Sequence, residues 1–302
     1  MGCFLSKNGD TNANRIARWR ATGIVALRDS KLKAFFGMNG FLEKVMLYCC
    51  VILARLVKTF DREHVYLQWS LCKQSFPDEI IKLDTSVRTL DLTHNRIVDI
   101  PMEINKLINI QRMVLAENLI ERLPMSLGKL QSLKLLNLDG NRITSLPDEL
   151  DQLVRLERLS VSRNLLASLP MTIGSLRNLV LLNVSNNKLR SLPESVGSCS
   201  SLEELQANDN LIEDLPSSVC NLSHLKSLCL DNNNVKQTPR NLLKDCKALQ
   251  NISLHGNPIS MDQLQQMEGF QEFEARRKKK FDKQNDSNVM IGSKGLDEGV
   301  DL

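Results

Sequence analysis

Asparagine recurs along this chain at a fixed step, and this step constrains the fold more than any other feature of the sequence. The step is 23 residues, with 24 before the last position, and its members are Asn95, Asn118, Asn141, Asn164, Asn187, Asn210, Asn233 and Asn257. Prolines keep the same spacing from Pro101 to Pro239. A period of this length indicates a repeat protein, in which each unit buries its apolar side only against its neighbours.

Each position within the unit has a physical reason. Residues 133–153 read L-x-x-L-x-L-x-x-N-x-I-x-x-L-P-x-x-L-x-x-L. The L-x-L stretch predicts a short strand whose alternate leucines point inward. An asparagine in the buried turn after it can bond backbone groups through both its carbonyl and its amide. Proline suits the opposite side of the unit, where no ladder hydrogen bond needs its missing N–H.

This pattern resembles the leucine-rich repeat in its 23-residue form with proline. The resemblance implies an α/β repeat fold, a leucine-rich-repeat solenoid (horseshoe) with a short parallel sheet on its concave face. The repeats run over 75–259, and the asparagines form a structural ladder.

The C-terminal part predicts a cap and a tail. Residues 260–283 are expected to form a capping helix with a basic end, which covers the last repeat with Leu264, Met267, Phe270 and Phe273. Basic residues favour the C-terminus of a helix. The polar, glycine-containing segment 284–302 is expected to be disordered.

The first repeat is interrupted. Residues 17–33 supply its N-terminal part, including Val25 and Leu27, but the pattern is then lost until Phe76-Pro77. Removing residues 34–74 restores the repeat, so a 41-residue insertion splits this unit. The insertion holds seven of the 13 aromatic residues.

Three interpretations of residues 34–74 remain. The apolar run 45–54 suggests a membrane segment, but it is about half the ~20 residues that a spanning helix needs. Insertions in repeat arrays also form functional loops on one face. We favour the third interpretation, an artefact of splicing or gene prediction, because deletion restores the repeat.

Residues 1–16 predict a membrane-directed tail. Met1 to Ser6 match the M-G-x-x-x-[ST] pattern for myristoylation of Gly2, and Cys3 offers a thiol for palmitoylation. A single myristoyl chain binds membranes only marginally, so a second signal is needed. Besides Cys3, basic residues can supply it by facing anionic lipid: Lys7, Arg15, Arg18 and Arg20.

The residue inventory argues against several classes of protein. A net charge of +4 over 302 residues does not suggest nucleic-acid binding. The four histidines are scattered and the eight cysteines form no C-x-x-C pair, so no enzyme, metal site or cofactor is expected. Without a secretory signal pattern, the cysteines are expected to be free thiols in a reducing cytosol.

The expected binding surface is the concave sheet. Its outward residues stand two, four and six positions before each asparagine, and arginine alternates with leucine in the last of these columns. Arginine beside apolar anchors is typical of interface centres. A merely solvated face is the alternative. The predicted partner-binding residues are Arg112, Val114, Leu135, Asn137, Arg158, Ser160, Leu181, Asn183 and Glu204.

The 23-residue unit with LP at its turn, together with a Met-Gly start and a basic C-terminal helix, resembles the plant intracellular Ras-group-related leucine-rich-repeat proteins. The resemblance implies a monomeric, non-catalytic signalling scaffold. The expected location is the cytoplasm, on the cytosolic face of a membrane. It also leaves open a regulatory subunit of a protein phosphatase or of a Ras-like small GTPase cycle.

Overall fold

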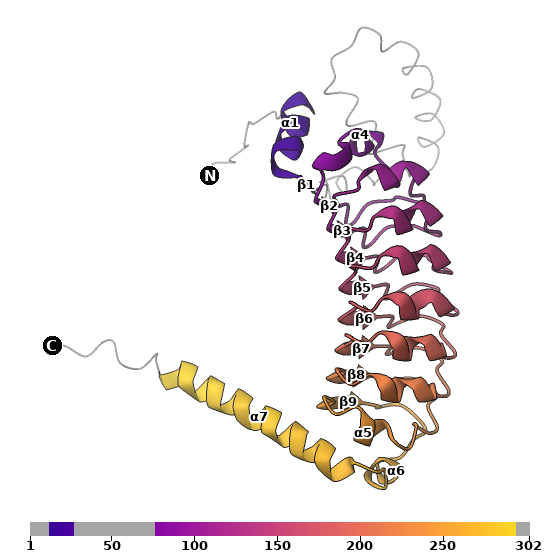
Figure 1. The fold of residues 1–302 in the computed structure, drawn as a ribbon, viewed down its shortest axis with the longest axis vertical. Helices are drawn as coiled ribbons and strands as arrows, with labels where there is room; N and C mark the ends of the chain where they lie inside the picture. Colours follow the sequence, from indigo (N-terminus) through magenta and orange to yellow (C-terminus); the bar gives the residue numbers. More distant parts are fainter. Residues whose placement is uncertain (1–11, 27–75, 294–302) are drawn as a thin grey trace, which may run out of the picture. The chain divides into compact units, whose positions relative to one another are not determined.

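The computed structural model describes residues 12–26 and 76–293 of the chain, which belong to two compact units divided between Leu153 and Val154. Each unit is a stack of short parallel strands on one side and 3₁₀ turns on the other (Figure 1). Each unit therefore has the leucine-rich-repeat architecture that the sequence predicts. We call these two sides the strand face and the turn face.

The first unit begins with helix α1 and ends with a 3₁₀ turn. Its helices are α1 (Asn12–Thr22) and α4 (Asp78–Ile81). Its strands are β1 (Ile24–Ala26), β2 (Thr89–Asp91), β3 (Arg112–Val114) and β4 (Leu135–Asn137). Its 3₁₀ turns are Asp84–Ser86, Met102–Lys106, Met125–Lys129 and Asp148–Gln152.

The second unit continues the same pattern and ends in helices. Its strands are β5 (Arg158–Ser160), β6 (Leu181–Asn183), β7 (Glu204–Gln206), β8 (Ser227–Cys229) and β9 (Asn251–Ser253). Its 3₁₀ turns are Met171–Ser175, Glu194–Ser198 and Ser217–Asn221. Its helices are α5 (Leu242–Asp245), α6 (Met261–Gln265) and α7 (Phe270–Ser293).

The core of each unit is made of aliphatic side chains in register. The central residue of each strand from β1 to β8 is buried, as Met113 and Leu182 show with 0% exposure, and that of β9 is half-buried. Further leucines and isoleucines from the turns fill the space behind the sheet, for example Ile104 and Leu222. Alternate residues of a strand point to opposite sides, so the flanking residues lie on the strand face.

The ladder asparagines join consecutive repeats. The amide of Asn118 donates to the carbonyls of Leu115 and Ala116 in its own repeat and, at 2.9 Å, to Leu92 in the preceding one. Its Oδ1 accepts the backbone N–H of Ile97, also in the preceding repeat, at 3.1 Å. In the second unit Asn187, Asn210 and Asn233 make the same set of bonds.

The turn face packs closely enough to require glycine. A Cβ atom on Gly197 would lie 2.2 Å from the carbonyl oxygen of Ser218 in the next turn, and one on Gly128 would lie 2.2 Å from that of Glu149. These oxygens belong to the backbone and cannot move away as a flexible side chain would. The 23-residue spacing thus sets the distance between successive turns as well as between strands.

The interrupted repeat lies between β1 and β2. The two strands pair in parallel, Ile24 with Thr89, although these residues are 65 positions apart, whereas Thr89 and Arg112 of β2 and β3 are 23 apart. The extra length of chain therefore falls inside this one repeat. Residues 34–74 themselves lie outside the described residues.

Helix α1 covers the β1 end of the first unit. Trp19 is 6% exposed, and the carbonyl of Trp19 accepts the backbone N–H of Gly23 where the helix ends. The tail predicted for residues 1–16 is therefore helical from Asn12 onward, and the strand of the first repeat starts only at Ile24.

The prediction of one continuous C-terminal helix over 260–283 is wrong. A capping box of Ser260 and Gln263 begins α6, and Gly269 at φ +87° separates it from α7. Helix α7 then continues to Ser293, beyond the predicted start of the tail at residue 284. The break turns the chain back onto the last repeat, where Phe273 is 3% exposed.

Arg276 fixes α7 to the end of the second unit. Its Nε donates to the carbonyl of Leu249 and its Nη2 to that of Leu243, both at 2.9 Å. The remainder of α7 projects away from the repeats (Figure 1). Arg276 therefore satisfies backbone groups, although the sequence places it within a basic run.

Candidate protein-binding surface

Residues that flank the buried centre of each strand form the candidate surface. In the first unit Arg112 and Val114 flank the centre of β3, and Leu135 and Asn137 flank that of β4. The strands pair Arg112 with Leu135 and Val114 with Asn137, so these four side chains form two rows.

The second unit repeats this arrangement over β5, β6 and β7. Its predicted residues are Arg158, Ser160, Leu181, Asn183 and Glu204. Arg158 pairs with Leu181, Leu181 with Glu204, and Ser160 with Asn183. Each predicted residue therefore stands at the end of a strand, beside its counterpart in the next repeat.

The apolar part of the predicted surface is less exposed than the sequence suggests. Leu135 and Leu181 are half-buried, whereas Arg112 and Arg158 are exposed. Adjacent strands lie only about 4.8 Å apart, so the neighbouring side chains cover much of each leucine. Leu135 and Leu181 therefore remain only partly exposed, between neighbours that are mainly polar.

The two arginines keep their guanidinium groups available. Within the part of the chain that the structure describes, neither Arg112 nor Arg158 forms a side-chain hydrogen bond or an ion pair. By contrast, Lys226 pairs with Glu203 at 2.7 Å. An exposed arginine without an internal acid can pair with a carboxylate on a partner.

Asparagines on the strand face are held in fixed orientations. The Oδ1 of Asn137 accepts the backbone N–H of Asp139 at 2.9 Å, and the Oδ1 of Asn183 accepts that of Ser185 at 3.1 Å. Only an oxygen can accept from a backbone N–H, so these bonds determine which end of each amide is which. The NH₂ group is the end left for other contacts.

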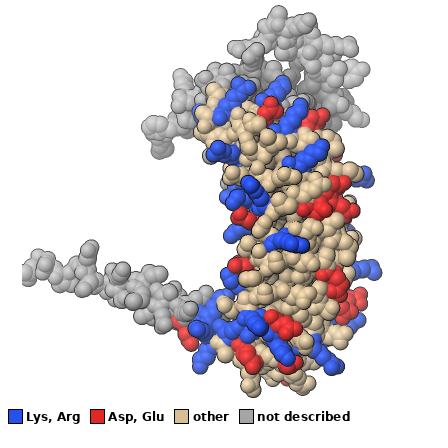
Figure 2. All heavy atoms as spheres, in the orientation of Figure 1, with Lys and Arg blue, Asp and Glu red and all other residues tan. Residues whose placement is uncertain are grey.

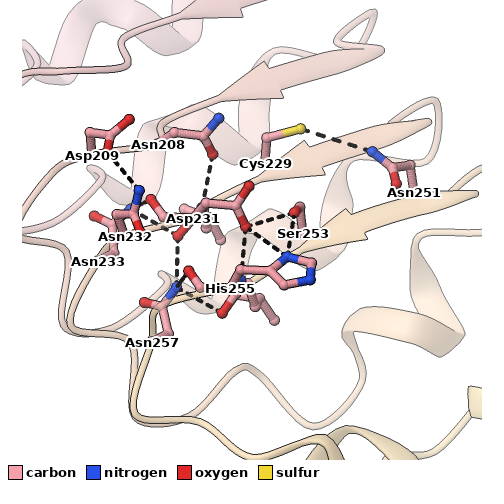
Figure 3. A network of polar contacts seen from close by, with 12 residues as sticks. Asn208, Asp209, Cys229, Asp231, Asn232, Asn233, Asn251, Ser253, His255 and Asn257 are labelled. Carbon is pink, nitrogen blue, oxygen red and sulfur yellow. Dashed lines mark hydrogen bonds and ion pairs between the residues drawn. The ribbon is translucent and has the colours of Figure 1, made fainter.

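A polar network lies at the carboxyl ends of β7, β8 and β9 (Figure 3). The Oδ1 of Asp231 accepts from the hydroxyl of Ser253 at 2.6 Å and from the backbone N–H of His255 at 2.8 Å. The same oxygen lies 3.4 Å from the Nδ1 of His255, whose side chain is 89% exposed. The Oδ1 of Asn208 accepts the backbone N–H of Asp231 at 2.8 Å.

Asp209 belongs to the same region but not to the predicted set. Its Oδ1 accepts from the Nδ2 of Asn232 at 2.8 Å, and it is exposed. Asp209 has a φ of +54° and stands directly before the ladder residue Asn210. Asparagine and aspartate tolerate this conformation, so the polar column before the ladder is the sequence signal that could have identified it.

Charged side chains are distributed unevenly over the second unit. On the face seen in Figure 2, basic and acidic groups gather at the end of this unit where α5 and α7 lie. Lys244 and Glu268 form one such ion pair there at 2.5 Å. Exposed pairs of this kind contribute little to stability, about 0–1 kcal/mol.

Burial keeps the cysteine thiols of the second unit protonated and therefore poorly reactive. Burial raises the pKa of the Cys199 thiol to about 11 and that of the Cys246 thiol to about 12. Burial also raises the pKa of Cys220, with a further contribution from Asp245. Thiolates are the reactive form, so the buried Cys199 and Cys246 act as small core side chains, whereas Cys220 is half-buried.

The described residues offer neither a metal cluster nor a membrane span. Over residues 12–26 and 76–293, His, Cys, Asp and Glu side chains do not gather in groups of three or more that could hold a metal ion. Within the same residues, every helix is too short or too polar to cross a bilayer. Gly2, Cys3 and the apolar run 45–54 lie outside these residues.

Comparison with protein families identifies leucine-rich repeats in both units. The "Leucine rich repeat" family matches residues 85–143, and the "Leucine-rich repeat region" family matches residues 125–209.

Two curated plant proteins are similar in sequence. "Plant intracellular Ras-group-related LRR protein 7" of rice (Oryza sativa subsp. japonica) is 66% identical over 302 residues, 100% of both chains. That alignment includes residues 34–74. An Arabidopsis thaliana protein described by its LRR repeats and ubiquitin-like domain is 41% identical over 63 residues, 21% of this chain and 17% of that protein.

Solved structures share the repeat fold. An internalin of Listeria monocytogenes has a TM-score of 0.53 at 23% identity, over 62% of this chain and 59% of its own, and shows the fold alone. The Arabidopsis receptor kinase HAESA, solved with the peptide hormone IDA and a co-receptor, has a TM-score of 0.55 at 25% identity. The match covers 60% of this chain and 32% of the HAESA chain.

The thiol environments predict a selective modification pattern. At pH 8, we expect iodoacetamide to alkylate Cys199 and Cys246 at least roughly 100-fold more slowly in the folded protein than in urea, because their pKa values lie above the ordinary 9.0. Site-resolved mass spectrometry measures each rate, with Cys229 as the half-buried comparison. Equal rates in folded and unfolded protein would contradict the burial.

The same shifts predict a loss of stability at alkaline pH. A thiol whose pKa is higher in the folded than in the unfolded state adds to the free energy of unfolding. This contribution is complete below the unfolded pKa of 9.0. The contribution is lost as pH rises through the folded values, about 11 for Cys199 and about 12 for Cys246. Near pH 7 both thiols are protonated in the folded and the unfolded state, so neither makes stability depend on pH there.

Proposed function

Because this chain belongs to the plant intracellular Ras-group-related leucine-rich-repeat proteins, we propose that it is a non-catalytic scaffold that binds a protein partner on its strand face. The observation that carries the proposal is the contrast between the two sides of each strand. The inward residues are mostly aliphatic, whereas the outward ones differ from repeat to repeat and include exposed arginines that form no internal ion pair among the described residues.

The variety of the strand face supports recognition of a particular partner. Outward positions do not contribute to stacking, so their side chains can change without loss of the fold. Arg112 and Arg158 supply exposed guanidinium groups, and arginine is enriched at the energetic centres of interfaces. HAESA, with the same fold, is described in complex with a peptide hormone, so polypeptide binding is compatible with this architecture.

Replacing Arg112 and Arg158 by alanine is expected to remove partners without unfolding the protein. Both side chains are exposed and make no internal ion pair within the described residues, so stability should change by less than about 0.5 kcal/mol. Proximity labelling in plant cells with the full chain, followed by quantitative mass spectrometry, measures partner recovery. Loss of a partner on Arg112→Ala alone would assign its contact to the first unit, and loss on Arg158→Ala alone would assign it to the second.

The matched control is the pair Arg155→Ala and Arg177→Ala, which removes two exposed arginines beside the turn face. We expect the control to retain every partner that the Arg112/Arg158 variant loses. Recovery of all partners by both variants would contradict binding through these arginines. A small GTPase or a protein phosphatase among the lost partners would identify the regulatory form of the function.

We also propose that the N-terminus tethers this scaffold to membranes. Gly2 would carry a myristoyl group and Cys3 a palmitoyl group, with nearby basic residues facing anionic lipid. Two acyl chains give stable anchoring where one does not.

Gly2→Ala keeps an α-amine but removes the N-terminal glycine that myristoylation requires, and is expected to shift the protein from the membrane pellet to the supernatant. Cys3→Ser should weaken pelleting and leave myristoylation intact, which intact-mass measurement of the N-terminal peptide reports directly. If Gly2→Ala fractionates like the unaltered protein, the tethering proposal fails while the scaffold proposal stands.

A further inference from the structure

We propose that the strand face of the second unit, over β6 to β8, binds an extended polypeptide segment that carries a basic side chain. This inference rests on the proposed scaffold function and specifies the chemistry of the partner. The residues that carry it are Asn183, Glu204, Asn208, Asp209 and Asp231.

The register of the strands brings Asn183, Asn208, Asp209 and Asp231 together at one end of the sheet, and Glu204 lies at the opposite end of β7 on the same face. Asn183 of β6 pairs with Gln206 of β7, and Gln206 pairs with Cys229 of β8. Asn208 and Asp231 follow those partners by two positions, beyond the ends of their strands. Adjacent strands lie about 4.8 Å apart, so the polar groups form a band at the carboxyl ends of three neighbouring strands.

Two amide groups in this band are oriented as donors. The Oδ1 of Asn183 is occupied by the N–H of Ser185, and the Oδ1 of Asn208 by the N–H of Asp231. Among the described residues, neither Nδ2 group has an acceptor. Each NH₂ group is therefore fixed in position and available to donate, which lowers the entropy lost on binding.

The neighbouring carboxylates determine which acceptor these donors can meet. Glu204, Asp209 and Asp231 have no lysine or arginine partner among the described residues, and Asp231 is paired only with the highly exposed His255. These three acids repel a phosphate, a nucleic acid or an anionic lipid. A neutral carbonyl oxygen is the acceptor compatible with this environment.

An extended segment presents such carbonyls, whereas an α-helix does not. The carbonyls of a helix interior are occupied by its own i→i+4 bonds, but those of an extended chain are free. A lysine or arginine in the same segment would pair with Glu204, Asp209 or the second oxygen of Asp231. The amides would bind the main chain of the segment, and the carboxylates would select its side chain.

The network in Figure 3 keeps this band rigid. Asp231 is held by Ser253 and by the backbone of His255, and Asp209 is held by Asn232. These bonds use one oxygen of each carboxylate, so the other oxygen can pair with a cation without disturbing the fold.

A random 12-residue peptide library displayed on phage and selected on the full-length protein tests the proposal. We expect enriched peptides to contain lysine or arginine. Synthetic copies in which the basic residue is replaced by glutamine are then titrated by fluorescence anisotropy against Asn183→Asp, so that the added carboxylate gains no pairing with a basic side chain. This variant keeps the oxygen that accepts from Ser185 but replaces the NH₂ group. We expect roughly tenfold weaker binding.

Matched controls make the same chemical changes away from the strand face. Asn221→Asp, on the 3₁₀ turn Ser217–Asn221, is expected to bind within about twofold of the unaltered protein. The double variant Glu204→Gln/Asp209→Asn should weaken basic peptides roughly tenfold, whereas Asp214→Asn should not. Replacing the basic residue of the peptide by a neutral one should cost less affinity in the double variant than in the unaltered protein, because only Asp231 remains to pair with it.

Three outcomes would overturn the proposal. They are the absence of any enriched peptide, enrichment of acidic peptides, and equal affinity of Asn183→Asp and Asn221→Asp. If any of these occurs while a native partner is still lost on substitution of Arg112 and Arg158, the scaffold function stands and only this inference is rejected.

Discussion

The hydrogen bonds of the ladder asparagines, buried from Asn118 to Asn233, are the interaction on which this structure depends. The turn that follows each strand buries backbone carbonyls and an N–H group that no ladder partner reaches. Asn187 satisfies them with a single side chain, because its NH₂ group reaches Val161, Val184 and Ser185 while its oxygen accepts from Leu166. Leaving such groups unpaired would cost about 1–3 kcal/mol each. The bonds also cross from one repeat to the preceding one, so they set the register of stacking.

Separation of stability from recognition follows from this constraint. Aliphatic side chains and asparagines occupy the inward positions, so nearly all the stabilising contacts lie behind the sheet. The outward residues are left to vary, and they differ between repeats from Arg112 to Leu135 to Glu204. The strand face can therefore acquire affinity for a partner without a matching loss of stability, as in other repeat proteins.

The periodic part of this structure is predictable from the sequence, and the local exceptions are not. The 23-residue step places every strand from β2 to β8, and a step of 24 places β9, because each inward leucine and each asparagine obeys one geometric rule. The half-burial of Leu135 and Leu181 depends on neighbouring strands, which a single repeat does not reveal. The break at Gly269 depends on how the chain returns to the last repeat. The orientation of the Asn183 amide depends on its bond to Ser185, which residue type alone does not specify.

Amide hydrogen exchange at the residues bonded to the ladder tests this account most directly. The N–H groups of Leu166, Leu189 and Ile212 lie outside strands and helices but donate to Asn187, Asn210 and Asn233, each at 3.0 Å. The account predicts slow exchange at all three, and in Asn210→Ala a selective loss of protection at Leu189 while Leu166 stays protected. Unchanged protection of Leu189 in that variant would contradict the central role of the asparagines.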